Sequence, residues 1–177
     1  MKPSGVADTE AATAADNPTA PTLGLRHLVL WVADPARSAE FYAAALGLVA
    51  KGDPSERAVF MSSPNSQTDH DLGLFRAEDP AQKPGGVGMY HVAWEVATLR
   101  ELETARERMR SLGALVGENN HGVSRSLYCK DPDGNEFEIM WEVPEDLIAD
   151  DEPSNIPLDF SADYARFGPD RQGRGAD

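Results

Sequence analysis

The sequence predicts an α+β fold in which two paired βαβββ modules form a cupped mixed β-sheet. Three observations predict it. The segments that begin at His27 and His91 share one order, an alternating apolar run followed by an amphipathic helical stretch that ends at a glycine. Short strand-like runs follow each helix. The length of 177 residues suits one domain or two small modules that share a core. Such internal repetition indicates one structural unit built twice.

The first module is predicted to span residues 23–80. Its first strand alternates with period two. Asp34 is the expected N-cap of the helix that follows, with Pro35 at the first helical position and Gly47 as the C-cap. The predicted elements are strand 26–32, a helix to residue 46, and strands 48–51, 58–62 and 71–75.

The second module is predicted to span residues 81–146 and repeats this order. Gly113 is expected to close its helix. The tetrapeptide 131–134, Asp-Pro-Asp-Gly, predicts a turn, since proline presets one φ and glycine accepts a positive one. The predicted elements are strand 90–96, helix 98–112 and strands 115–117, 124–129 and 136–143.

Both ends of the chain differ in composition from the modules. Residues 1–22 are rich in Ala, Thr, Pro and Asp without periodicity, which predicts a disordered arm. Residues 147–177 form an acidic C-terminal tail that is expected to finish loosely. Three aromatic residues in this tail could pack on the domain or on a second subunit, and composition leaves both open: Phe160, Tyr164 and Phe167.

The composition of the chain limits the classes of partner that it is expected to bind. The formal net charge of −14 argues against nucleic acid and anionic membranes, because both attract basic patches. The sequence has no run of eighteen apolar residues that could span a bilayer, and its first residues lack the apolar core of a secretory signal. The single cysteine, Cys129, excludes an internal disulfide and predicts a cytoplasmic protein with an inert strand thiol.

Alternation along the strands predicts which side chains face away from the helices. His27, His91 and Glu138 fall on this face. Two histidines and one carboxylate form the facial triad that leaves open positions on non-haem Fe(II). With two neutral imidazoles and one carboxylate, Fe(II) carries one net positive charge, which a singly deprotonated catechol would neutralise. The sequence therefore predicts a metal site between the modules.

Three segments carry a resemblance to a known family. They are HDLGLF from His70, YHVAWEV from Tyr90 and HGVSRSLYCKDPDGNEFEIMW from His121. They resemble the extradiol, catechol-2,3-dioxygenase-like branch of the vicinal oxygen chelate superfamily, which also includes glyoxalases, fosfomycin-resistance proteins and bleomycin-binding proteins. The resemblance covers roughly residues 25–144.

The resemblance implies an Fe(II)-dependent enzyme that opens a small aromatic diol with O₂, with Mn(II), Ni(II) or Zn(II) as alternative metals. It implies His27, His91 and Glu138 as metal ligands. It also implies a proton-transferring role for His70, and contacts to substrate oxygens from His121 and Tyr128.

Two other functions stay open. A glyoxalase-like isomerase or lyase would need a fourth ligand, for which this sequence offers His70 or Asp71. A non-catalytic drug-binding protein would use the acidic charge and stack its ligand on tryptophans: Trp31, Trp94 and Trp141. Arg125 could bind a carboxylated substrate or pair with an acid, and the oligomeric state is open.

Overall fold

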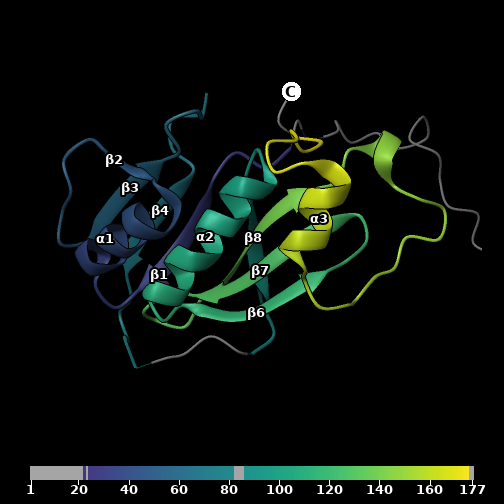
Figure 1. The fold of residues 1–177 in the computed structure, drawn as a ribbon. Coiled ribbons are helices and arrows are strands. Elements are labelled where there is room, and N and C mark those ends of the chain that lie inside the picture. The colour runs from purple at the N-terminus through teal and green to yellow at the C-terminus, as the bar shows by residue number, and fades with distance from the viewer. Residues whose placement is uncertain (1–21, 23, 82–85, 176–177) are drawn as a thin grey trace, which may run out of the picture.

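The computed structural model describes residues 22, 24–81 and 86–175. The predicted arm at residues 1–22 therefore lies almost wholly outside the described residues. Two four-stranded mixed sheets make up the fold, in the strand orders β1-β4-β3-β2 and β5-β8-β7-β6 (Figure 1). This repeated order confirms the α+β prediction of two βαβββ modules. No helix within the described ranges is long and apolar enough to cross a membrane.

The first sheet pairs β1 with β4 in parallel and the other neighbours in antiparallel. Helix α1 begins after Asp34, whose carboxylate accepts hydrogen bonds from two backbone N–H groups of the first turn. It ends at Gly47, which has the left-handed φ of 70° that glycine tolerates best. The elements are β1 (Leu28–Val32), α1 (Pro35–Leu46), β2 (Val49–Lys51), β3 (Ala58–Ser62) and β4 (Leu72–Arg76).

The second sheet repeats this pattern, with β5 parallel to β8. Thr98 and Glu101 form a reciprocal capping box at the start of α2. Strand β6 runs to Asn120, beyond the predicted end at Gly117, because pairing with β7 extends through residues of low strand propensity. The elements are β5 (His91–Glu95), α2 (Leu99–Ser111), β6 (Leu115–Asn120), β7 (Ser124–Lys130) and β8 (Glu136–Glu142).

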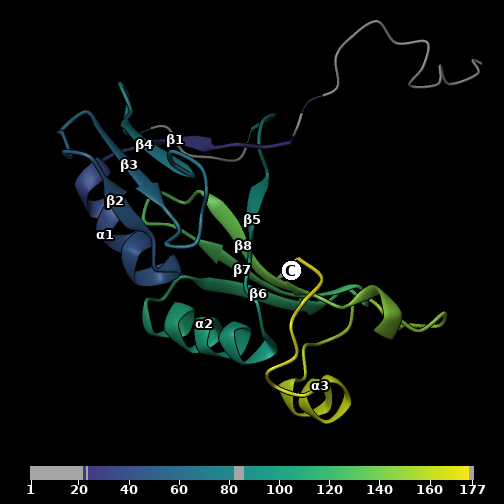
Figure 2. The same cartoon turned by 90° about the horizontal axis from the view of Figure 1, so that it is seen from above.

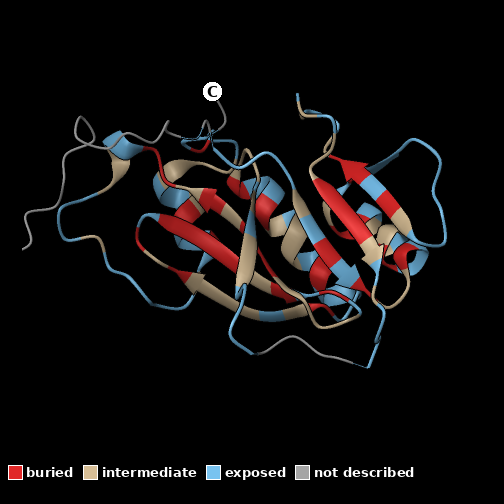
Figure 3. Cartoon of the chain, turned by 180° about the vertical axis from the view of Figure 1, so that it is seen from behind, coloured by how far each residue is buried: buried red, intermediate tan, exposed pale blue. Residues whose placement is uncertain are grey.

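Each sheet has one face covered by its helix, and the core lies there (Figure 3). In β1, Leu30 and Val32 are buried, whereas Trp31 between them is 67% exposed. In β8, Phe137, Ile139 and Trp141 are buried. The predicted alternation of faces is therefore confirmed in these strands.

The two sheets do not share a hydrogen-bonded ladder among the described strands (Figure 2). The predicted turn at 131–134 supplies side-chain contacts between the modules. Asp131 accepts a hydrogen bond from the buried Tyr42 hydroxyl of α1 at 3.2 Å. Asp133 accepts one from the Ala33 N–H at 2.9 Å and pairs with Arg37. A cavity of about 170 Å³ lies between the start of β1 and the middle of β5.

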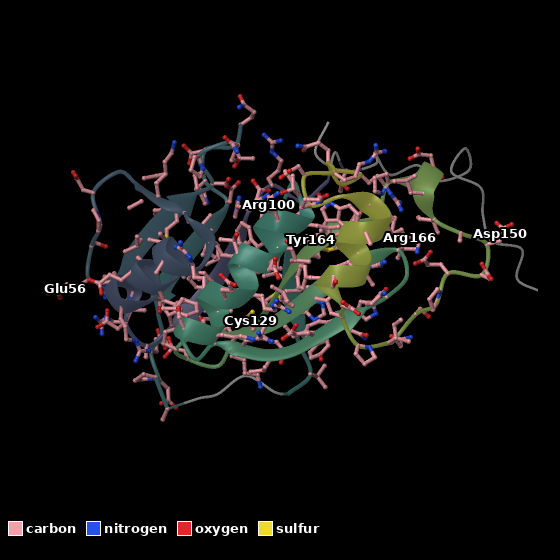
Figure 4. All side chains as sticks on the ribbon, viewed as in Figure 1. Glu56, Arg100, Cys129, Asp150, Tyr164 and Arg166 are labelled. Atoms are coloured by element: carbon pink, nitrogen blue, oxygen red, sulfur yellow. The ribbon has the colours of Figure 1, made fainter. Side chains whose placement is uncertain are left out.

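The C-terminal segment packs against its own domain. The short helix η2 (Glu145–Leu147) precedes α3 (Phe160–Phe167), which lies beside α2 (Figure 1). Tyr164 of α3 donates a hydrogen bond to Glu103 of α2 at 2.6 Å, and Figure 4 shows its side chain between the two helices. The prediction of a loose end is wrong for residues 168–175, because the Gly173 N–H donates to the Ala97 carbonyl at 2.8 Å beside a bridge between Thr98 and Gln172.

Candidate metal centre

His91 and Glu138 lie together on the face of the second sheet that no helix covers. His91 opens β5 and Glu138 is central in the parallel neighbour β8. The His91 Nε2 atom lies 3.2 Å from a Glu138 carboxylate oxygen. Glu138 is only 7% exposed, and the buried Nδ1 of His91 has no hydrogen-bond partner among the described residues. Two of the three predicted ligands therefore meet.

Tyr128 and His121 extend this cluster on the same sheet. Tyr128 lies directly across the β7–β8 ladder from Glu138, and its ring centroid is 5.7 Å from that of His91. The Tyr128 hydroxyl lies 2.7 Å from His121 Nε2, within hydrogen-bonding distance. Burial, followed by the Glu138 charge, raises the pKa of Tyr128, so its phenol stays protonated at neutral pH.

His27 does not join this cluster, contrary to the expectation that three ligands converge. Its ring instead contacts the His70 ring in a tilted arrangement, with centroids 4.5 Å apart. His70 in turn contacts the exposed Asp69 carboxylate at 2.9 Å. The described residues hold no group of three or more His, Cys, Asp or Glu side chains in a metal-binding arrangement. The physical reason is that His27 precedes β1 and no backbone ladder fixes β1 relative to β5.

His91 and Glu138 have the right chemistry to supply two of the ligands of a divalent cation. An imidazole nitrogen and a carboxylate oxygen already converge, and neutral imidazole with carboxylate is a donor set suited to Fe(II), Mn(II), Ni(II) or Zn(II). The third predicted ligand, His27, lies against His70 and would have to turn or move toward the pair to bind the same ion. The assignment of His27 as a ligand stays a prediction.

Asp71, the alternative fourth ligand, is engaged elsewhere. It accepts hydrogen bonds from the Ser66 and Thr68 hydroxyls at 2.7 and 2.6 Å. Burial acts to raise the pKa of Asp71, but these hydrogen bonds outweigh it and the pKa is lowered. The carboxylate is therefore held within its own loop and is a poor fourth metal ligand.

Arg125 and Trp141 are likewise shielded from a ligand. Arg125 is 1% exposed, and its Nε donates to the buried Asp163 carboxylate at 2.8 Å. It is thus paired with an acid and does not line a substrate site. Trp141 is fully buried and cannot stack on a bound drug, whereas Trp31 is exposed.

Cys129 lies in β7 beneath α2 (Figure 4). Its thiol is buried, and burial raises its pKa to about 12. A thiol in this state stays protonated at neutral pH, so the prediction of an inert cysteine is confirmed.

One group that contacts the cluster carries no signal in the sequence. Asn155, in the C-terminal segment, places its side-chain oxygen 3.2 Å from His121 Nδ1. Asn119 at the end of β6 donates to the same oxygen at 3.3 Å. Sequence periodicity reveals only which face of a helix or strand a residue lies on, so it gives no indication of a contact made by an asparagine in an irregular segment. Its left-handed φ of 57° is visible only in the structure.

Two curated relatives are similar to part of this chain. Catechol-2,3-dioxygenase of Bacillus subtilis (strain 168) is 33% identical over 75 residues, which is 42% of this chain and 26% of that protein. Biphenyl-2,3-diol 1,2-dioxygenase 2 of Rhodococcus globerulus is 41% identical over 82 residues, 44% of this chain and 43% of that protein. The matches thus span less than half of either relative.

Solved structures show the same fold. A glyoxylase/bleomycin resistance protein/dioxygenase domain from Frankia sp. EAN1pec aligns with TM-score 0.59 and 19% identity over 69% of this chain and 93% of that one. The fosfomycin resistance protein FosX from Listeria monocytogenes, complexed with Mn(II) and sulfate ion, aligns with TM-score 0.52 and 20% identity over 67% and 90%. A family model matches residues 24–139, and the chain therefore belongs to the Glyoxalase/Bleomycin resistance protein/Dioxygenase superfamily.

Proposed function

We propose that this chain is an extradiol-type ring-cleavage dioxygenase that acts on a small aromatic diol with O₂ and depends on a divalent metal, Fe(II) first. The observation that carries the proposal is the cluster on the second sheet, where the His91–Glu138 pair lies beside the Tyr128–His121 contact. The names of two relatives, a catechol dioxygenase and a biphenyl-diol dioxygenase, support the substrate class.

His91 and Glu138 would hold the metal, with His27 as the proposed third ligand. A bound Fe(II) would act as a Lewis acid that polarises the hydroxyl oxygens of the diol. Mn(II), Ni(II) and Zn(II) are the alternatives. Because Glu138 is nearly buried, its charge is poorly screened by water and favours a cation at this position.

Tyr128 and His121 would handle the substrate hydroxyl. A phenol with a raised pKa keeps its proton and can orient a diol oxygen by hydrogen bonding. An imidazole has an ordinary pKa of about 6.5, which suits proton transfer near neutral pH. The proposed role of His70 in proton transfer depends on the approach of the first module, since His70 contacts His27.

The proposed partners are the diol and O₂, and the acidic net charge of −14 disfavours nucleic acid. Trp31 and Val29 are exposed on the uncovered face of the first sheet, where an aromatic ring could contact them. A cytoplasmic location and assembly into a homo-oligomer stay predictions.

The test is oxygen consumption by protein loaded anaerobically with Fe(II). With a panel of catechols, we expect one O₂ consumed per diol and a yellow ring-opened semialdehyde. Glu138→Gln should lose metal retention and activity together, because it removes the charged ligand. Glu142→Gln is the matched control, since Glu142 lies on the same strand and face but pairs with Arg174. No oxygen uptake with any catechol by iron-loaded protein would overturn the proposal.

The same sample separates the two alternative functions. An isomerase would convert a glutathione hemithioacetal with Ni(II) or Zn(II) and consume no O₂. A drug-binding protein would bind a cationic ligand whether or not Glu138 was replaced. The Asp71 carboxylate is held in its own loop, which argues against an isomerase that uses Asp71 as its fourth ligand. Trp141 is buried, which argues against a drug-binding protein that stacks its ligand on this residue.

A further inference from the structure

The C-terminal segment after β8 returns to the cluster on the second sheet. Asn120, at the end of β6, and Ile156 exchange two backbone hydrogen bonds, of 3.0 and 3.2 Å. Gly122, in the turn after His121, faces residues 152–154 so closely that an added Cβ would lie 3.2 Å from Glu152 and 3.3 Å from the Pro153 carbonyl. This close packing fixes the segment that carries residue 155 beside His121.

The contact between Asn155 and His121 has a defined polarity. The Asn155 side-chain oxygen accepts a hydrogen bond from the Asn119 amide at 3.3 Å and lies 3.2 Å from His121 Nδ1. An amide oxygen can only accept, so this contact is a hydrogen bond only when Nδ1 carries a proton. Asn119 Nδ2 also lies 3.5 Å from Nδ1, which would favour the opposite state. That contact is the longer of the two and the weaker hydrogen bond.

A proton on Nδ1 determines whether the other ring nitrogen, Nε2, donates or accepts a hydrogen bond. In a neutral imidazole one nitrogen is a donor and the other an acceptor. His121 Nε2 is then the acceptor, and the Tyr128 hydroxyl donates to it across 2.7 Å. The hydroxyl oxygen of Tyr128 keeps its lone pairs free to accept a hydrogen bond from another group.

We propose that Asn155 is a positioning residue that holds His121 in the Nδ1–H tautomer and so makes His121 Nε2 the proton acceptor of the Tyr128 hydroxyl. The consequence for chemistry rests on the proposed function. A diol hydroxyl that donates to Tyr128 would then have a continuous path for its proton, through the phenol to His121 Nε2. The other tautomer would present an N–H to Tyr128 and block that transfer.

The test is the ring tautomer of His121, observed by two-bond ¹⁵N–¹H correlation in metal-free protein labelled with ¹⁵N-histidine. The sample is held near pH 8, a condition under which a free imidazole is neutral. His121→Asn assigns the signal among the four histidines. We expect wild-type protein to show His121 with its proton on Nδ1.

Two variants separate the side chain from the backbone. Asn155→Gly keeps the left-handed φ of 57° without strain and removes the acceptor, so we expect the Nε2–H tautomer to become the major form. Asn155→Asp keeps an acceptor oxygen and should restore Nδ1–H. A wild-type ring protonated on Nε2, or an Asn155→Gly ring that stays protonated on Nδ1, would overturn the proposal.

Activity gives an independent readout. If the chain cleaves a catechol, Asn155→Gly should lower kcat by about 10- to 100-fold with KM nearly unchanged, and Asn155→Asp should recover most of it. Equal kcat in the wild type and Asn155→Gly would contradict the consequence for proton transfer. If no catechol is cleaved by wild-type protein, the proposed function fails, and the tautomer spectra alone decide the role of Asn155.

Discussion

At the residue scale, the site depends on how neighbouring strands place four side chains. The register of β8 against β5 and β7 puts Glu138 beside His91 on one side and Tyr128 on the other. His121 follows β6 in the turn that leads into β7, which brings its ring to the Tyr128 hydroxyl. All four side chains lie on strands of the second sheet or in the turn between two of them.

Replacing Tyr128 tests its role in catalysis. Tyr128→Phe should keep the metal and slow kcat by about 10²-fold, because it removes the hydroxyl proposed to contact both substrate and His121. Tyr90→Phe is the matched control, since Tyr90 is a neighbouring phenol that is 73% exposed. Steady-state oxygen uptake with metal analysis of both variants measures the effect. An unchanged kcat in Tyr128→Phe would show that the phenol only packs.

Ionisation of the Tyr164 phenol should make the stability of the fold fall as the pH rises through the alkaline range. Burial, followed by a hydrogen bond to Glu103, raises its pKa from about 10 to about 12. A raised pKa in the folded state contributes stability that is present below about pH 10 and is lost between about pH 10 and 12. Urea denaturation should therefore show the advantage of wild type over Tyr164→Phe shrinking across this interval. A constant difference would contradict the assignment.

At the scale of elements, α3 is attached to β7 through a buried ion pair. Arg125 donates to Asp163 at 2.8 Å and lies 3.6 Å from Glu152, and all three side chains are nearly inaccessible. Arg166 of α3 also donates to Glu152, at 2.6 Å. The C-terminal segment is thus tied to the sheet near the place from which Asn155 reaches His121.

Breaking this ion pair should destabilise the fold strongly. Asp163→Ala removes the nearer acid and leaves the buried Arg125 guanidinium beside Glu152, 3.6 Å away. We expect this to lower the free energy of unfolding by about 3 kcal/mol. The double variant Arg125→Met with Asp163→Leu should recover most of that loss, because it removes both charges and keeps apolar volume. Urea denaturation measures each value. A loss below about 0.5 kcal/mol, typical of a surface substitution, would show that the pair is solvated.

Elements were largely predictable from the sequence, because caps and periodicity are local signals. Asp34, Pro35 and Gly47 mark both ends of α1 as predicted, and the alternating faces of β8 are confirmed. The attachment of α3 could not be predicted in this way. Arg125 and Asp163 are far apart in sequence, and an arginine among strand residues is equally consistent with a substrate contact and with an ion pair.

At the scale of the whole molecule, the second module carries the cluster and the first module carries His27 and His70. The pairing of His91 with Glu138 follows from adjacent strands of one sheet, which alternation can predict. The position of His27 depends on how two sheets without a common ladder approach each other. No pattern within one strand encodes that distance, which is why the sequence predicted three converging ligands and the structure brings together two.

The central claim is that His91 and Glu138 bind a divalent cation, and crystallography on Fe(II)-soaked crystals with anomalous data at the iron edge tests it most directly. The account predicts one anomalous peak within bonding distance of His91 Nε2 and a Glu138 carboxylate oxygen, with His27 drawn toward it. A map with no peak there, and with His91 Nε2 still 3.2 Å from Glu138, would contradict the claim.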